Sequence, residues 1–286
     1  MARRVSRKLE LFSVHAHNNN EEIDYKKIVS TFKALPRSLR ITKIGNMVFG
    51  FPVVTEMEGI YFMQVLEGDP EATTLIFDRA TGRASETELA DSELISQATH
   101  LVIHPEKRLA AIEYVRRGAK AVQIGPAIAS VLKSNTSDFR LLDLEFPPKI
   151  AKGFSEQIAT FERIRVASLR ITRPNASWTD HYTDLSDLME TSGGEKAEID
   201  VRAGRGASLE KNKGIVQVIK EISEDEHPYI EEAAITGTRA NESAETVVRS
   251  STHILHTRVS VEANNSGEVY DNSIRSKLVS FISSWL

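Results

Sequence analysis

The sequence predicts an α+β protein with two sub-domains, a strand-rich N-terminal half and a mixed β/α C-terminal half closed by a terminal helix. Short apolar runs separated by turn residues dominate the first half, and strands mix with helical-period runs in the second. The regular strand–helix alternation of a barrel or Rossmann fold is missing. The polar stretch 133–137 (Lys-Ser-Asn-Thr-Ser) is typical of a linker. We therefore expect domains at 1–136 and 137–286.

Local patterns predict the elements of the first half in order. Four basic residues within 1–8 indicate a solvated arm, or an arm that contacts nucleic acid. The expected elements are a strand over 9–15, a helix over 21–35 ended by Pro36, strands over 38–44 and 47–55 around the turn Gly45-Asn46, strands over 59–66 and 73–78, and a hairpin of 99–104 with 109–116. A helix closes this half, and we expect it to begin at Pro126, because proline favours the first helical turn.

The second half alternates less regularly. Pro147-Pro148 stops the first strand, and Ser208 is a candidate N-cap for the third helix. The expected elements are a strand over 138–146, a helix over 150–161, a strand over 163–172, a helix over 178–189, a strand over 196–202, a helix over 208–223, a long hairpin of 229–239 with 246–262, and an amphipathic helix over 269–286.

The composition excludes several classes of protein. Of 286 residues, 41% are hydrophobic, which is too many for a disordered chain. The sequence contains no run of about 18 apolar residues, so we expect no transmembrane helix. The absence of cysteine excludes disulfide scaffolds, cysteine-ligated zinc and thiol catalysis. We expect a cytoplasmic protein without a cofactor or a structural metal.

Two patterns leave a metal-dependent nuclease or hydrolase open as an alternative. His15 and His17 follow an apolar strand and would share one of its faces, as the His-x-His of amidohydrolase-type enzymes does. The other histidines show no companion motif. Paired carboxylates at 143/145 and 198/200 resemble nuclease acids, but neither pair is followed by the acid-x-Lys spacing.

The stretch 201–208 (Val-Arg-Ala-Gly-Arg-Gly-Ala-Ser) is the best candidate for binding an anion. It leads from a predicted strand into a predicted helix, whose N-terminus offers free N–H groups. Gly204 and Gly206 allow the backbone to turn toward a ligand. The side chains that would contact phosphate are Arg202, Arg205, Lys211 and Lys213.

Other basic residues cluster in the sequence although the net charge is −4, with 36 Lys and Arg against 40 Asp and Glu. One cluster lies on or beside a predicted strand and comprises Arg163, Arg165, Arg170 and Arg173. Another comprises Arg116, Arg117 and Lys120. Acidic stretches alternate with these clusters, and such segregation permits a basic face on an acidic protein. An evenly mixed surface after folding is the alternative.

Three segments resemble the Rex exclusion protein A family of lambdoid phages. They are the hairpin 99–118 (Thr-His-Leu-Val-Ile-His-Pro through Tyr-Val-Arg-Arg-Gly), the strand 139–146 (Phe-Arg-Leu-Leu-Asp-Leu-Glu-Phe), and 161–171 (Phe-Glu-Arg-Ile-Arg-Val-Ala-Ser-Leu-Arg-Ile). The order of the closing hairpin and helix is also similar, and the defence protein KwaB is a looser comparison. The resemblance implies a cytoplasmic, dimeric, largely sequence-independent DNA-binding protein that acts in phage exclusion or defence. The acidic net charge departs from that pattern.

The expected function is therefore binding of double-stranded DNA through phosphate contacts, without base readout. The contacts would come from the two basic groups at 163–173 and 202–213. A homodimer is expected, because the C-terminal sequence Phe281-Ile-Ser-Ser-Trp-Leu286 needs cover. A membrane or effector partner protein, without direct membrane insertion, fits the same setting, and a scaffold that recognises a phage protein is a third reading.

Overall fold

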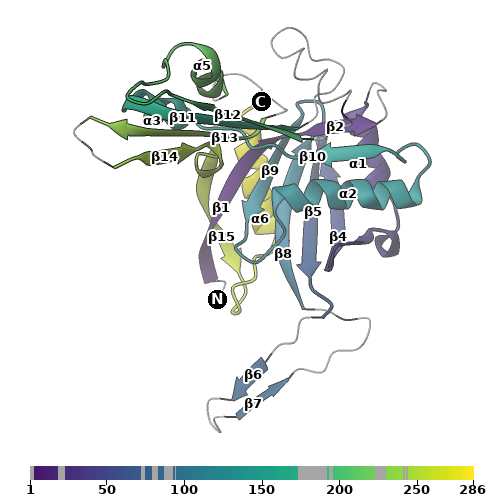
Figure 1. Cartoon of the computed structure of the whole chain (residues 1–286). Helices are drawn as coiled ribbons and strands as arrows, with labels where there is room; N and C mark the ends of the chain where they lie inside the picture. The colour runs from purple at the N-terminus through teal and green to yellow at the C-terminus, as the bar shows by residue number, and fades with distance from the viewer. Residues whose placement is uncertain are drawn as a thin grey trace. The chain divides into compact units, whose positions relative to one another are not determined.

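The computed structural model divides the chain into two compact units (Figure 1). It describes all residues except 1–2, 19–22, 72–74, 79–82, 87–92, 94, 173–191, 193–195, 223–229, 241 and 243. Unit 1 comprises 1–10, 16–146 and 257–286, and unit 2 comprises 11–15 and 147–256. The mixed α+β class expected from the sequence is confirmed, with strands prevailing over helices.

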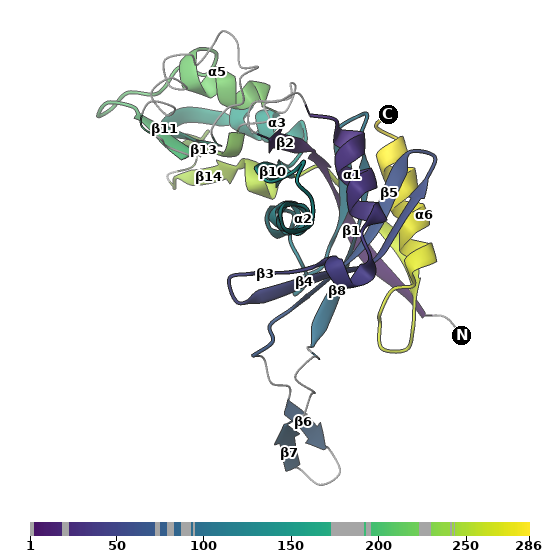
Figure 2. The ribbon, with the colours of Figure 1, turned by 90° about the vertical axis from the view of Figure 1, so that its right-hand side faces the viewer.

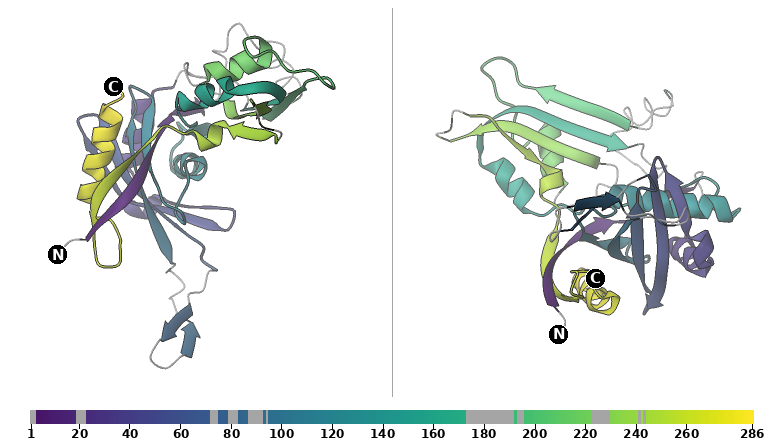
Figure 3. Two further views of the ribbon diagram at one scale, coloured as in Figure 1. Left: turned by 90° about the vertical axis from the view of Figure 1, so that its left-hand side faces the viewer. Right: turned by 90° about the horizontal axis from the view of Figure 1, so that it is seen from below.

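A seven-stranded sheet forms the centre of unit 1. Its strand order is β15-β1-β9-β8-β5-β4-β3, so strands from both ends of the chain lie side by side (Figure 3). The bounds are β1 (Arg3–Ser13), β3 (Ile41–Ile44), β4 (Met47–Met57), β5 (Ile60–Gly68), β8 (Ser96–His104), β9 (Leu109–Tyr114) and β15 (His256–Ala263). The pairs β3–β4, β4–β5, β5–β8 and β8–β9 are antiparallel.

Helices cover both faces of this sheet (Figure 2). Helix α6 (Asp271–Ser283) packs against β5, β8 and β9 through Ile274, Leu278 and Ile282, which are fully buried. The opposite face carries α1 (Tyr25–Ala34) and α2 (Ala121–Asn135), together with the short η1 (Arg37–Leu39). Asp24 caps α1, since its carboxylate accepts from the backbone N–H of Lys27 at 3.0 Å.

Two small sheets complete unit 1. Strand β10 (Leu142–Glu145) pairs with β2 (His15–Asn18) and packs against α2. This contact needs glycine in the helix, because a Cβ at Gly125 would lie 2.3 Å from the carbonyl oxygen of Leu144. Strands β6 (Leu75–Asp78) and β7 (Arg83–Glu86) form an antiparallel pair.

Unit 2 is a four-stranded antiparallel sheet with helices on one face. The strand order is β12-β11-β13-β14, with bounds β11 (Phe161–Thr172), β12 (Lys196–Arg202), β13 (Ile230–Arg239) and β14 (Thr246–Arg249). The short η2 (Ser250–Thr252) follows β14, and the helices are α3 (Gly153–Ala159) and α5 (Gly214–Glu221). Phe154, Ile158, Val216 and Ile219 bury their side chains in one core with Leu169 of β11.

Contacts divide the chain differently from the predicted 1–136 and 137–286. The terminal helix and β15 belong to unit 1, because their apolar residues complete the seven-stranded sheet and its cover. The predicted hairpin of 229–239 with 246–262 is correspondingly wrong. Of the predicted partner segment 246–262, only Thr246–Arg249 pairs with β13. The short η2 then interrupts the chain, and β15 joins the other sheet.

Two local predictions also need correction. The predicted start of a helix at Pro126 is wrong, because α2 begins at Ala121, where the Gln123 side chain accepts from the backbone N–H of Lys120 at 2.8 Å. Residues from Arg3 onward do not form a solvated arm but strand β1. The predicted helix over 178–189 lies outside the described residues. No helix in the described part of the chain is long and apolar enough to cross a membrane.

Candidate nucleic-acid interface

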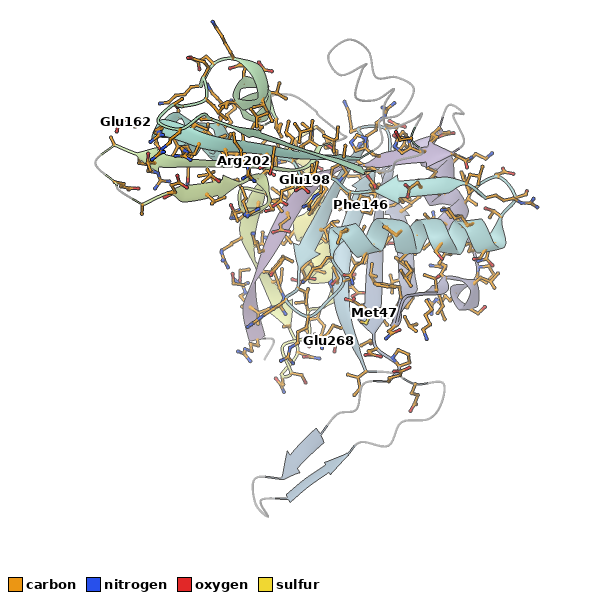
Figure 4. All side chains as sticks on the ribbon, in the orientation of Figure 1. Met47, Phe146, Glu162, Glu198, Arg202 and Glu268 are labelled. Atoms are coloured by element: carbon orange, nitrogen blue, oxygen red, sulfur yellow. The ribbon has the colours of Figure 1, made fainter. Side chains whose placement is uncertain are left out.

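Among the described residues, the helices of unit 2 cover one face of its sheet and leave the other face open. Side chains alternate along β11, so that Ala167, Leu169 and Ile171 are buried toward α3 and α5, while Ser168 and Arg170 point the other way. Figure 4 labels Glu198 and Arg202 on the neighbouring strand β12. We call the surface that carries these outward side chains the open face.

Arg170 is paired twice on the open face. The register places it between Glu198 of β12 and Glu232 of β13. Its guanidinium lies 3.3 Å from a carboxylate oxygen of Glu198 and 3.6 Å from one of Glu232, which also lies 3.5 Å from Arg249. Arg170 is therefore already neutralised by two carboxylates.

Arg202 has an acidic neighbour too. Its guanidinium lies 3.5 Å from Asp200, which also accepts a hydrogen bond from the Ser168 hydroxyl. That hydrogen bond, helped by Arg202 and opposed by partial desolvation, lowers the pKa of Asp200. Asp200 therefore carries a negative charge at neutral pH, and the open face presents both positive and negative side chains.

The predicted basic group 163–173 does not form one basic surface. Arg165 lies 4.0 Å from Glu245, and Arg170 is paired as above. Arg163 donates from Nε to the carbonyl oxygen of Ala207 at 2.9 Å. Arg173 lies outside the described residues. The sequence could not show this mixing, because the opposing acids come from three other segments.

The second predicted group lies on the connection between β12 and α5, which we call the 203–213 loop. Ala207 N–H donates to the carbonyl oxygen of Gly204 at 2.9 Å, and Gly206 has φ of +82°. A four-residue turn with positive φ at its third residue is a type II turn, which favours glycine there. Arg205 occupies the second position and is exposed at the tip of the turn.

Hydrogen bonds fix the 203–213 loop along β11. Ala203 N–H donates to the carbonyl oxygen of Arg165, and Leu209 N–H donates to that of Ile164, both at 2.9 Å. Between them, the Ser208 hydroxyl accepts from the N–H of Ile164 at 3.0 Å. The loop is thus an ordered extension of the sheet.

The expectation that Ser208 caps a helix is wrong. Helix α5 begins at Gly214, and Lys213 occupies the N-cap position without a side-chain cap. Leu209 is half-buried against the core of unit 2, and a further turn at 211–212 separates it from the helix. The hydroxyl of Ser208 serves β11 instead.

Three cations of the 203–213 loop form no ion pair with any carboxylate that the structure describes. They are Arg205, Lys211 and Lys213, of which Arg205 and Lys213 are exposed and Lys211 is half-buried. Glu210 is the acidic residue among them. Asn212 accepts a hydrogen bond from Lys220 of α5 at 2.9 Å, which ties the end of the loop to the helix.

The third basic cluster, in unit 1, is partly structural. The ammonium group of Lys120 donates to the carbonyl oxygens of Val115 and Arg116 and lies 4.5 Å from the centre of the Tyr114 ring. Burial lowers the pKa of Lys120, against the attraction of Glu67 and Glu10. Arg116 and Arg117 remain exposed.

The histidine pair gives no metal centre among the residues that are described. No group of three or more His, Asp or Glu side chains in those residues could hold a metal ion. Burial lowers the pKa of His17, which Asp143 opposes, and this favours the neutral imidazole. The two predicted carboxylate pairs belong to different units. Glu198 and Asp200 lie on the open face of unit 2, and Asp143 lies in the small sheet of unit 1.

Sequence reasoning missed a charged cluster inside unit 1. His100 lies between two carboxylates, with Nδ1 at 2.6 Å from Glu113 and Nε2 at 3.2 Å from Asp271 of α6. Glu113 also pairs with Arg7 of β1 at 2.8 Å. In the predicted hairpin of β8 with β9, Leu101 pairs with Ile112. The next pair in this register is His100 with Glu113, so this contact could have been predicted from the sequence.

Neither protein-family models nor curated proteins gave a match to this chain.

Proposed function

We propose that this protein binds double-stranded DNA without sequence preference, through the 203–213 loop of unit 2. The observation that carries the proposal is the arrangement of Arg205, Lys211 and Lys213. They extend from a loop that β11 holds in place, and they form no ion pair with a described carboxylate. A phosphate backbone can therefore approach them without first displacing a carboxylate of the described residues.

The physical basis is the release of counterions. Each cation that meets a phosphate frees a condensed counterion, which favours binding to any sequence. Contacts of this kind fix the position of a protein on DNA but read no bases. Arg202 can add a contact if phosphate displaces Asp200, 3.5 Å away, whereas Arg170 would have to leave two carboxylates.

Few phosphate contacts per chain favour a homodimer, because two linked loops bind one duplex more tightly than one. Self-association is part of the proposal and is supported by Trp285 and Leu286, each of which leaves 50% of its surface exposed at the end of α6. The rest of α6 is covered within unit 1, with Ile282 fully buried. The cytoplasmic location and the role in phage exclusion or defence, with a membrane or effector partner, are supported by the family resemblance.

The test replaces Arg205, Lys211 and Lys213 together by alanine and measures affinity for two unrelated 30-base-pair duplexes by fluorescence anisotropy over a salt series. Both affinities should fall equally, and the slope of log affinity against log salt should flatten by up to about 2.7, since each contact contributes about 0.9.

The matched control removes three other exposed cations, Lys43, Lys107 and Lys133 of unit 1. This variant has the same net charge but should keep the affinity and slope of the unsubstituted protein. Equal losses in both variants would assign the effect to net charge and overturn the proposal. DNA cleavage in the presence of a divalent metal would favour the nuclease instead.

A further inference from the structure

We infer that Ser208 is a positioning residue for phosphate binding, a role that rests on the proposed function. Its hydroxyl takes the place of a backbone carbonyl beside β11, and in doing so it holds the turn that carries Arg205. Ser208 itself need not contact DNA.

The pairing of β12 with β11 shows why a side chain is needed at this point. The regular register ends at Val166↔Arg202, and one further bond follows from Ala203 to Arg165. The chain then turns away at 204–207 and returns at Leu209, which donates to Ile164.

Between these two bonds the N–H of Ile164 faces the loop, and its acceptor is Oγ of Ser208 at 3.0 Å. The Ile164 side chain is fully buried, and the hydrogen bond between its N–H and the Ser208 hydroxyl is partly buried. A buried N–H without an acceptor is unfavourable. The hydroxyl in turn donates to the carbonyl oxygen of Leu209 at 3.1 Å, so both of its hydrogen-bonding roles are used within the loop.

Arg163 supports the same arrangement from the other side of the turn. Its Nε donates to the carbonyl oxygen of Ala207, the residue before Ser208. The turn 204–207 is therefore held at Ala203, at Ala207 and at Ser208. Arg205 at its tip has a fixed backbone position, and only its side chain must be ordered when DNA binds.

A loop that is ordered before binding loses less conformational entropy in the complex, which strengthens binding without adding a contact. Removing the hydroxyl should free residues 207–209 from β11 while leaving every cation of the loop in the sequence. Affinity should then fall, whereas the number of phosphate contacts, and with it the salt slope, should stay the same.

The experiment compares Ser208→Ala, Ser208→Thr and Ser155→Ala with the unsubstituted protein, again on a 30-base-pair duplex over a salt series. Ser208→Ala should bind about 5–10-fold more weakly with an unchanged slope, and hydrogen exchange should be faster in 203–209 but not in β13. Ser208→Thr keeps the hydroxyl and should restore both affinity and protection.

Ser155→Ala controls for the loss of a hydroxyl outside the loop, since Ser155 of α3 donates to the carbonyl oxygen of Lys152 at 2.9 Å, and it should bind DNA and protect 203–209 as the unsubstituted protein does. Normal affinity in Ser208→Ala with loop exchange accelerated would overturn the inference, because the loop would then bind equally well when released. Unaccelerated exchange would overturn it too. If the Arg205, Lys211 and Lys213 variant also binds normally, the proposed function itself fails.

Discussion

The charged cluster inside unit 1 and the open face of unit 2 both pair arginines with carboxylates, but the two regions differ in their exposure to water. Glu113 exposes 2% of its side chain between Arg7 and His100, whereas Glu198 exposes 63% beside Arg170. A buried carboxylate cannot recover hydration when it loses a partner, while an exposed one can. Ion pairs of similar length should therefore differ several-fold in their effect on stability.

The comparison also separates structural charges from those available for binding. His100, Glu113 and Asp271 connect β8, β9 and α6, so a change at any of them acts on the fold. The ion pairs of the open face connect exposed side chains, and the half-buried Glu232, within one sheet. They modify the surface charge and leave the core of unit 2 untouched.

The largest expected effect is that of Glu113→Ala. It leaves Arg7 and the buried His100 without their shared carboxylate, 2.8 Å and 2.6 Å away, and should lower the free energy of unfolding of unit 1 by about 3 kcal/mol. Hydrogen exchange of β8, β9 and α6 amides measures this loss. Glu232→Ala in unit 2 is the matched control and should cost less than about 1 kcal/mol. Equal losses would contradict the distinction between the two regions.

A smaller effect should come from releasing Arg170. The double variant Glu198→Gln and Glu232→Gln removes the two carboxylates at 3.3 Å and 3.6 Å but keeps the size of both side chains. Arg170 and Arg249, which lies 3.5 Å from Glu232, then become available to phosphate, so affinity for duplex DNA should rise and the salt slope should steepen by up to about 1.8, about 0.9 for each cation.

The same double substitution in a background of Arg170→Gln and Arg249→Gln is the control for that gain. It removes both released cations, so the slope should return to that of the unsubstituted protein. A gain that survives the loss of Arg170 and Arg249 would show that lower net negative charge is sufficient.

The smallest effect concerns the half-buried His17. Burial lowers its pKa in the folded protein, so the unfolded chain takes up a proton there at higher pH than the fold does. The contribution of neutral His17 is present above about pH 6.5 and is lost as the pH falls below it. His17→Gln should consequently be less destabilising at pH 5 than at pH 7.5 in chemical denaturation. An identical cost at both pH values would show that the imidazole does not titrate differently on folding.

Local sequence signals correctly predicted two hairpins of the seven-stranded sheet. The turn Gly45-Asn46 between β3 and β4 and the turn between β8 and β9 lie where residue types indicate, and both strand pairs are antiparallel. Gly45 has φ of +58°, which explains the glycine in that turn. Each of these signals lies within about 20 residues of chain.

Contacts between distant segments could not be predicted in the same way. Strand β1 lies between β9 and β15, and no local pattern indicates that a strand at 256–263 pairs near the N-terminus. The candidate site shows the same division. The glycines and cations of 202–213 predicted an exposed basic loop, but the role of Ser208 depends on Ile164, 44 residues earlier.

The order of segments in unit 1 has a consequence for synthesis of the chain on the ribosome. Residues 147–256 interrupt unit 1 as an insertion, and its two ends meet, since Leu255 N–H donates to the carbonyl oxygen of Lys149 at 2.7 Å. The inserted unit can fold as soon as it emerges, while the enclosing sheet waits for β15 and α6. Until then β1 has one unpaired edge, which can pair with other nascent chains. Translation pauses within 257–286 should therefore increase aggregation more than pauses within 147–256.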